Sequence, residues 1–421
     1  MRSLFLTLLT LLLTTAWAYG QANKAEVSVQ GNGNTTTVEQ QGNQNEALVR
    51  QGLGPGILSG HASSATIDQR GREHYAESVQ IGHGNTSDQF QRGRENESYS
   101  RQEGSNNTVN TRQRGRENFA EGRTLFLSAG NTIDIQQDHD AGQSARENVA
   151  ISESTGANNS SIITQYNGNR NEVGDATTRD AGVRQAGLGN TSNVLQAEGN
   201  RNQADVAQQS SFLGNTSVVE QTYGDRNRAR VNQDGNANTS EIYQNQGDRN
   251  RARVDQNGDG NLSLIGQGGL FLLTGNENEA RVRQDGDFNS SAIGQLGGDG
   301  NYADIRQVGY LNRSEIGQLV GDDNEVYLIQ DGAGNISLVG QLGGDHNYAE
   351  ILQLGQVNDS TIGTLLGDDN TIFVTQDGNL NTSLIGILGN GNMVDVQQLG
   401  NLNQSNISII GNNNTSTVIQ Q

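Results

Sequence analysis

Polar and apolar residues alternate along almost the whole chain in short units that each begin with asparagine. Residues 289–295 (NSSAIGQ), 301–307 (NYADIRQ) and 312–318 (NRSEIGQ) share one template: Asn, any residue, a small residue, any residue, an aliphatic residue, any residue, Gln. A turn containing glycine follows each unit, and the next unit starts after about eleven or twelve residues. Counted back to Asn23, this pattern gives about sixteen repeats of roughly 22 to 23 residues, with two units in each repeat.

Each unit predicts one β-strand. Side chains alternate between the two faces of a strand, so the first, third, fifth and seventh template positions share one face. From residue 215 to residue 421 no Asp, Glu, Lys or Arg occupies these four positions, although 18 % of the chain is charged. The face that carries Asn, the small residue, the aliphatic residue and Gln is therefore predicted to point into a dry interior.

Buried asparagine and glutamine side chains need partners, because an unpaired buried amide costs about 1–3 kcal/mol. Parallel stacking of the repeats places each amide about 4.8 Å above its counterpart, so that amide N–H groups can donate to amide oxygens along the stack. The fold class predicted from the sequence is all-β: a two-sheet, cross-β β-solenoid with one strand-turn-strand rung per repeat, about 80 Å long.

The inward positions of the most regular part of the chain are predicted to form two kinds of column. The structural amide columns contain Asn278, Gln284, Asn289, Gln295, Asn301, Gln307, Asn312, Gln318, Asn324, Gln330, Asn335, Gln341, Asn347 and Gln353. The apolar core columns contain Val282, Ile293, Ile305, Ile316, Leu328, Val339, Ile351, Ile362, Val374 and Ile385. Substitution of Lys for an inward Gln should bury an unpaired charge, and the same change on the outward face should have little effect.

The composition narrows the classes of function. Hydrophobic residues make up only 32 % of the 421 residues, so an ordinary aliphatic core of this size cannot form. The chain has 56 glycines, one proline and no cysteine, which excludes disulfides, zinc–thiolate sites and cysteine nucleophiles. Its net charge of -20 argues against a nucleic-acid partner, whose phosphates would be repelled.

The first eighteen residues are typical of a secretory signal peptide. Arg2 precedes an apolar run over residues 4–13, and Ala16-Trp17-Ala18 supplies a small-x-small cleavage motif before Tyr19. The apolar run is too short to span a bilayer, and no later stretch is long enough to do so. The sequence therefore predicts a signal peptide over residues 1–18 and export of the remaining chain.

Residues 19–421 are predicted to form a single solenoid whose regular spacing is interrupted by insertions. The insertions lie near residues 52–60, 121–130, 138–147, 175–182 and 268–276. Solenoids place insertions in the arcs between strands, so these segments are predicted to be loops.

No candidate catalytic or cofactor site stands out in the sequence, because no nucleophile, base and orienting acid recur together. The five histidines are scattered, and His74 occupies the Asn position of a unit. Turns such as residues 297–301 resemble calcium-binding nonapeptide repeats only faintly, since their aspartates lack the regular spacing. We therefore predict a protein that is not an enzyme and has no catalytic residues, no cofactor and no metal site.

A basic stripe is predicted on the outward face. It consists of arginine pairs that recur at similar template positions and are expected to stack in register: Arg228 and Arg230, Arg251 and Arg253, and Arg281 and Arg283. The stripe can be interpreted as a site for an anionic polymer, or as a solvated face that neighbouring acidic residues balance.

The template also bears on assembly. It continues through the last unit at residues 414–420, and the first unit after the predicted cleavage starts at Asn23. Open strand edges at both ends would be templates for another copy. These features predict a self-assembling polymer subunit that grows head-to-tail into a cross-β fibre. The alternative class is a monomeric β-solenoid, either an adhesin or a carbohydrate- or ice-binding surface protein.

The repeat resembles the curlin repeat, whose pattern is Ser-x3-Gln-x-Gly-x2-Asn-x-Ala-x3-Gln. The pattern positions are taken here by Ser291, Gln295, Gly298, Asn301, Ala303 and Gln307, with one extra turn residue before the glycine. The resemblance covers nearly the whole chain after the predicted signal peptide and indicates an unusually long member with many repeats. It implies a secreted subunit of curli, the extracellular functional amyloid fibres that serve biofilm matrix, adhesion and cell aggregation in Gram-negative-type bacteria. It also implies an outer-membrane secretion pore, a periplasmic chaperone and a minor nucleator subunit as partners.

Overall fold

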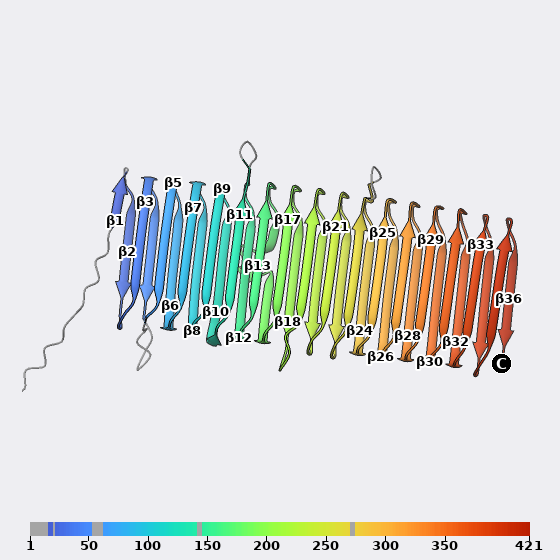
Figure 1. Cartoon of the computed structure of the whole chain (residues 1–421). Helices are drawn as coiled ribbons and strands as arrows, with labels where there is room; N and C mark the ends of the chain where they lie inside the picture. The colour runs from blue at the N-terminus through green and yellow to red at the C-terminus, as the bar shows by residue number, and fades with distance from the viewer. Residues whose placement is uncertain (1–15, 20–21, 53–61, 141–144, 270–273) are drawn as a thin grey trace, which may run out of the picture.

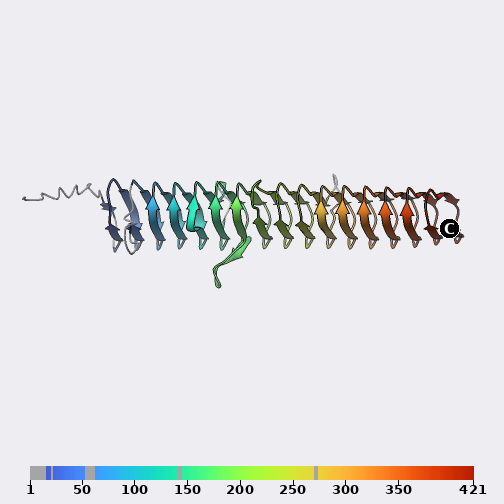
Figure 2. The same cartoon turned by 90° about the horizontal axis from the view of Figure 1, so that it is seen from below.

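Thirty-six β-strands and no helix make up the regular secondary structure of the described residues. The computed structural model describes residues 16–19, 22–52, 62–140, 145–269 and 274–421. The strands coil into a long, nearly straight stack of two facing parallel sheets (Figures 1 and 2). This arrangement confirms the predicted all-β, two-sheet β-solenoid, which has about sixteen turns.

The first sheet, called sheet A, contains seventeen strands and all of them have odd numbers. They are β1 (Ala16–Tyr19), β3 (Thr35–Asn43), β5 (Ser64–Arg72), β7 (Thr86–Arg94), β9 (Thr108–Arg116), β11 (Thr132–Asp138), β13 (Ser160–Tyr166), β17 (Thr191–Ala197), β19 (Thr216–Thr222), β21 (Thr239–Asn245), β23 (Leu262–Gly268), β25 (Ser290–Leu296), β27 (Arg313–Leu319), β29 (Ile336–Leu342), β31 (Asp359–Leu365), β33 (Thr382–Leu388) and β35 (Gln404–Ile410).

The second sheet, called sheet B, contains the even-numbered strands. They are β2 (Lys24–Val29), β4 (Glu46–Gln51), β6 (Tyr75–His83), β8 (Glu97–Ser105), β10 (Phe119–Ala129), β12 (Val149–Ala157), β14 (Glu172–Asp175), β16 (Val183–Leu188), β18 (Gln203–Gln209), β20 (Arg228–Asp234), β22 (Arg251–Asn257), β24 (Glu279–Asp287), β26 (Tyr302–Tyr310), β28 (Glu325–Ala333), β30 (Tyr348–Gln356), β32 (Thr371–Asn379), β34 (Met393–Leu399) and β36 (Thr415–Gln420). Strand β15 (Asp180–Ala181) pairs only with β14, in antiparallel orientation.

Neighbouring strands pair in the register that the template predicts. In sheet A, for example, Ser263 pairs with Ser291, and the Ile and Gln that follow at alternate positions also pair with their counterparts. Each rung therefore repeats the side chains of the rung below it. Because side chains in a strand alternate between faces, this register carries the inward and outward sets through the whole stack without a change of face.

The interior of the solenoid is apolar along most of its length. One cluster of buried aliphatic side chains runs from Val109 to Ile409, and a smaller cluster occupies the first rungs. Between the two, Ser78, Gln89 and Ser100 take the aliphatic position of the template, and all three are buried. The polar residues at these positions explain why the apolar core is divided in two.

Two of the predicted insertions differ from simple loops. Residues 121–124 lie within strand β10, in register with β8 and β12, and only the short segment before Ser128 departs from the register as a bulge. The predicted loop at 121–130 was therefore wrong, because the strand continues through most of it. The segment 175–182 is part of the β14–β15 hairpin, the green excursion from the stack in Figure 2. The other insertions include residues 53–60, 141–144 and 270–273, which lie outside the described ranges.

Residues 1–15 of the predicted signal peptide also lie outside the described ranges, and Ala16–Tyr19 form β1, which pairs with β3. The signal peptide stays a prediction; cleavage before Tyr19 would remove most of β1. In the part of the chain that the structure describes, no helix has the length and apolar character needed to cross a membrane.

Candidate functional site

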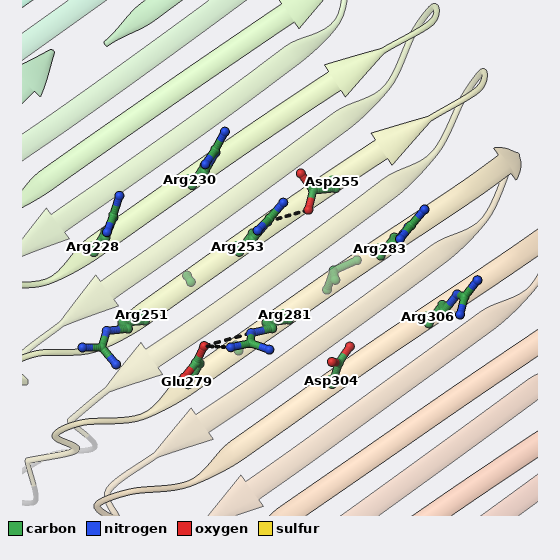
Figure 3. Close-up of a pocket in the computed structure, with 13 residues that line it drawn as sticks. Arg228, Arg230, Arg251, Arg253, Asp255, Glu279, Arg281, Arg283, Asp304 and Arg306 are labelled. Carbon is green, nitrogen blue, oxygen red and sulfur yellow. Dashed lines mark hydrogen bonds and ion pairs between the residues drawn. The ribbon is translucent and has the colours of Figure 1, made fainter.

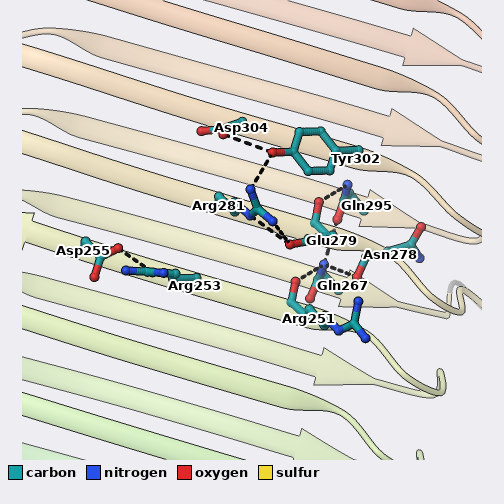
Figure 4. Close-up of polar contacts among 10 residues, drawn as sticks. All are labelled: Arg251, Arg253, Asp255, Gln267, Asn278, Glu279, Arg281, Gln295, Tyr302 and Asp304. Atoms are coloured by element: carbon teal, nitrogen blue, oxygen red, sulfur yellow. Dashed lines mark hydrogen bonds and ion pairs between the residues drawn. The ribbon is translucent and has the colours of Figure 1, made fainter.

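Glutamine side chains form a continuous column through sheet A. Twelve successive bonds of 2.8–3.1 Å run from Gln40 to Gln341, in each of which the amide N–H of one glutamine donates to the amide oxygen of the next. The Nε2 of Gln267 also donates to the backbone oxygens of Arg251 and Asn278, on the facing side of the rung (Figure 4). After Gln341 the column ends, because Thr364, Ile387 and Ile409 take its position.

Sheet B carries a second column with the same geometry. Ten bonds of 2.8–3.0 Å join Gln185 to Gln420. A shorter run joins Gln51 to Gln102, and Thr124 and Ser154 interrupt the column between the two runs. In both sheets the donor belongs to the N-terminal rung and the acceptor to the C-terminal rung. The columns therefore have a polarity, with amide N–H groups directed toward the C-terminal end of the stack.

Asparagine side chains hold the turns and differ from the expected amide column. The Oδ1 of Asn278 accepts the backbone N–H of Asn301 at 2.9 Å, and its Nδ2 donates to the backbone oxygen of Gly298 at 2.8 Å. Asn301 repeats both bonds one rung further on, at 3.0 Å to Asn324 and 2.7 Å to Gly321. Direct amide-to-amide contacts also occur, for example at 3.1 Å between Asn324 and Asn301. Each asparagine thus fixes the backbone of the next rung.

The structure places every predicted column residue in the interior. The fourteen amide residues are at most 3 % exposed, and the ten apolar residues are at most 2 % exposed. The glutamines and asparagines come together as separate columns in each sheet, and the aliphatic side chains lie between them in one cluster.

Several buried serines in sheet A have no hydrogen-bond partner. Ser263 Oγ and Ser291 Oγ are buried and unpaired, as are the hydroxyls at the same position in several other rungs. Ser314 differs, since it accepts a bond of 2.9 Å from Gln307 and donates one of 2.8 Å to Gln330. Ala occupies the equivalent position in many strands of sheet B, so the slot requires a small side chain and not a hydroxyl.

Glycine is needed where the turns stack most closely. A Cβ added to Gly298 would lie 2.0 Å from the backbone oxygen of Gly321, whereas a Cβ on Gly294 would meet nothing within 4 Å. The glycines of the turns are therefore required by the close approach of successive rungs, which brings backbone oxygens within reach of the asparagine amides.

His74 substitutes for asparagine in one turn. Its Nδ1 accepts the backbone N–H of Asn96 at 3.3 Å, and its Nε2 lies 3.3 Å from the backbone oxygen of Arg70. These two contacts reproduce the acceptor and donor of the asparagine amide, provided that the imidazole is neutral. Burial, which is only partly offset by hydrogen bonds to backbone oxygens, lowers the pKa of His74 below its usual value.

The outward arginines of sheet B differ in register from the predicted stripe in one rung. Arg228 pairs with Arg251, but Arg251 then pairs with Glu279, and Arg253 pairs with Arg281. The predicted stacking of the third arginine pair on the first two was therefore wrong by two residues. Register follows the buried Asn and Gln positions, and the exposed arginines do not set it. Figure 3 shows these side chains spread over several strands of the outer face.

The sequence reasoning overlooked aromatic columns on the same outer face. Tyr302, Tyr327 and Tyr348 lie with ring centroids 5.2 and 5.8 Å apart. Each phenol donates to a carboxylate two residues away in its own strand, at 3.1 Å for Asp304 and 2.9 Å for Glu350. The signal was visible in the sequence as Tyr-x-Asp, Glu-x-Tyr and Tyr-x-Glu at the outward positions of successive sheet B units.

Comparison with known families identifies the repeat. The model of the curlin-associated repeat matches five segments, at residues 224–252, 275–309, 298–332, 321–355 and 367–400. The chain contains curlin-associated repeats. The search of the curated proteins found no match.

The curlin-repeat family is structural, and the repeats and β-solenoid fold of this chain support a curli-like structural protein. Within the described ranges, no group of three or more His, Asp or Glu side chains is placed to hold a metal ion. The chemistry that the buried columns offer is hydrogen bonding in one direction along the stack, which is repeated at every rung.

Proposed function

We propose that this curlin-repeat protein is a secreted structural subunit that self-assembles head-to-tail into extracellular curli-like amyloid fibres. The observation that carries the proposal is the polarity of the stack, in which asparagine side chains accept the backbone N–H of the next rung from Asn23 at one end to Asn392 at the other. Stacking of a second copy in the same direction continues the strand pairing and these asparagine bonds. The glutamine columns do not meet at the junction, because Ile409 and Val29 take the glutamine positions of β35 and β2. Stacking in the opposite direction brings donor against donor or acceptor against acceptor.

The last described rung offers this continuation. Strand β36 pairs with β34 on one side, and Gln398 donates to Gln420 as in every earlier rung of the column. Gln420 Nε2 donates to the backbone oxygen of Gln404 at 2.9 Å. At the other end, Asn23 begins the first unit of sheet B, and its Oδ1 accepts the backbone N–H of Asn45. Rung-on-rung addition in the same direction would place Asn23 of one copy above Asn414 of another, where the backbone-to-amide bond of the interior can form again.

The fibres are proposed to serve as biofilm matrix and to promote adhesion and cell aggregation. Membership of the curlin-repeat family supports this role, and it also supports secretion through an outer-membrane pore with a periplasmic chaperone and a minor nucleator subunit. Secretion of the full-length chain from a Gram-negative host, with and without such a pore, would test the export route. Retention of the chain in both hosts would contradict it.

The assembly step can be tested with the purified chain from residue 19 onward. We expect an amyloid dye to report growth after a lag, and seeds to shorten the lag. Oriented fibres should give a meridional reflection near 4.7–4.8 Å. Because the columns are polar, labelled monomer should extend a seed with different rates at its two ends. A chain that stays monomeric for days, or fibres without the strand-spacing reflection, would contradict the proposal.

A further inference from the structure

Two chemically opposite fields lie side by side on the outer face of sheet B. The arginine field comprises Arg228, Arg230, Arg251, Arg253 and Arg281 on strands β20, β22 and β24. It borders a shallow hollow of about 600 Å³ (Figure 3). Among the described residues only two of the five arginines form an ion pair, Arg253 with Asp255 at 2.6 Å and Arg281 with Glu279. The field therefore carries a local positive charge on a chain whose net charge is -20.

The aromatic-acidic field comprises Glu325, Tyr327, Tyr348, Glu350 and Phe373 on strands β28, β30 and β32. Its rings form a column with centroid distances of 5.8 and 5.7 Å. The phenols of Tyr327 and Tyr348 donate hydrogen bonds to the two glutamates, and these bonds hold the carboxylates beside the rings. Strand β26 lies between the two fields and contributes Tyr302 and Asp304.

The chain itself contains an occupied version of the aromatic-acidic field. On strands β6, β8 and β10, Tyr75, Tyr99 and Phe119 alternate with glutamates in the same outward pattern, with ring centroids 5.3 and 5.5 Å apart. The β14–β15 hairpin closes over it, and the guanidinium of Arg179 lies 4.4 Å from the ring centroid of Tyr99. The backbone oxygen of Arg179 accepts a bond of 2.8 Å from Arg123, which holds the hairpin in place. This surface chemistry thus binds a guanidinium where the chain supplies one.

Arg281 shows the same preference at the border of the open field. Its guanidinium lies 5.3 Å from the ring centroid of Tyr302 and donates to the phenol oxygen at 3.1 Å (Figure 4). No segment of the described chain covers the remaining rings of the open field, and a guanidinium over an aromatic face is favourable. The complementary groups are present in the arginine field of another copy.

We propose that two copies of this protein pair laterally through sheet B, with the stack axes antiparallel, so that the arginine field of each copy lies on the aromatic-acidic field of the other. The pairing rests on the proposed self-assembly only for its extension along a fibre. A two-fold axis along strand β26 exchanges β24 with β28, β22 with β30 and β20 with β32, and the strands keep their direction. Such an interface is isologous, since each contact occurs twice.

The residue positions match under this operation. Arg230 meets Phe373, Arg251 meets Tyr348, and Arg253 meets Glu350, because each pair shares its template position. Arg281 meets Tyr327 in the same way. Glu279 also meets Glu325, and the neighbouring Arg281 and Tyr327 already donate to these two carboxylates. The match places a guanidinium group over a ring in every rung from β20 to β32 except the central one, and Arg253 beside the carboxylate of Glu350.

The size of the contact is sufficient for a stable pair. Seven rungs at about 4.8 Å and seven residues at about 3.3 Å give a face of roughly 34 Å by 23 Å, or about 800 Å² per partner. The stack shows little twist over these rungs (Figure 1), so the two faces can stay in contact along this length. The interface is salt-sensitive, because its arginines lie at the surface.

Cross-linking at two outward positions tests the pairing. The native chain has no cysteine, so Asn232→Cys and Thr375→Cys each introduce a single thiol, at the same template position on β20 and β32. Packed sheet faces lie about 10 Å apart, so a bismaleimide that spans roughly this distance is the appropriate probe. A mixture of the two variants should give the mixed dimer, at least tenfold over either variant alone. Dimers of one variant with itself, or no dimers, would overturn the proposal.

A charge-reversal set separates the pairing from fibre growth. Arg230→Glu, Arg251→Glu and Arg253→Glu combined should reduce the mixed dimer at least tenfold. The matched control Arg201→Glu, Arg226→Glu and Arg249→Glu changes the same charge in exposed turns and should leave the dimer unchanged.

Filaments that elongate normally but show no mixed dimer would overturn the pairing and leave the proposed function intact. If the mixed dimer forms but filaments do not elongate, the proposed function would be overturned and the pairing would stand. Retention of a soluble polyuronate by the unpaired native chain, and its loss in the charge-reversal set, would overturn the pairing in favour of a polyanion site.

Discussion

Replacement of Gln307 by Lys tests the interior columns most directly. Gln307 is fully buried, and its Oε1 accepts a bond of 2.8 Å from Gln284. Its Nε2 donates to Ser290 O at 3.0 Å, Ser314 Oγ at 2.9 Å and Gln330 Oε1 at 2.9 Å. An ammonium group can still donate to the three oxygens, but it cannot accept the bond from Gln284. The substitution therefore removes one acceptor and places a charge where no carboxylate lies inward.

The free-energy cost of the buried charge has an upper limit, because the lysine can lose its proton and become neutral. A lysine with an ordinary pKa of about 10.4 that is forced to be neutral at pH 7 costs about 4.6 kcal/mol, at 1.36 kcal/mol per pH unit. The lost acceptor adds at most about 1 kcal/mol, because Gln284 keeps its bond of 3.0 Å to Leu262 O. We expect a loss of about 3–5 kcal/mol for this rung. The neighbouring Arg306→Lys, on the exposed face, should cost less than about 0.5 kcal/mol.

Hydrogen exchange is the suitable assay, since a repeat stack can open locally around one rung. Amide protection over residues 302–310 should fall by about two to four orders of magnitude in Gln307→Lys and stay unchanged in Arg306→Lys. The folded-state pKa of the introduced lysine is lowered, so the unfolded chain binds more protons and the lost protection should return as the pH rises toward about 10.4. Unchanged protection in Gln307→Lys, or equal losses in both variants, would refute the reasoning.

Three further predictions concern single positions. Ser291→Ala should stabilise the chain by up to about 1 kcal/mol in urea unfolding, because it removes an unpaired buried hydroxyl, whereas Ser314→Ala should destabilise it by about 1–2 kcal/mol; the reverse order would contradict the bonding described. Gly298→Ala should lower the unfolding midpoint through a clash at 2.0 Å, while Gly294→Ala should be neutral or stabilising, and equal midpoints would exclude the close-approach argument. The pKa of His74 is lowered in the folded state, so the stability that the neutral imidazole contributes is present above pH 6.5. This stability is lost as the pH falls from 6.5 through the folded-state pKa. His74→Asn should abolish the loss, as measured by hydrogen exchange at residues 75–83.

The sequence determined the facing of nearly every side chain. A period of two places alternate residues on one face, and the absence of charge at four positions per unit identifies that face as the interior. The same pattern predicted the parallel register, because in-register stacking lets buried glutamines such as Gln284 and Gln307 satisfy each other. Repetition made these inferences robust, since each rung gives the same answer.

How the asparagines bond and in which direction the columns point can be seen only in the folded chain. Asn278 uses its oxygen for a backbone N–H and its nitrogen for a turn oxygen, a division that depends on how closely the turns stack. The hairpin that carries Arg179 to Tyr99 and the shifted partner of Arg251 were equally hidden in the sequence. Outward positions carry no burial constraint, so their neighbours follow from the register that the interior imposes and from chain segments that fold back over the sheet.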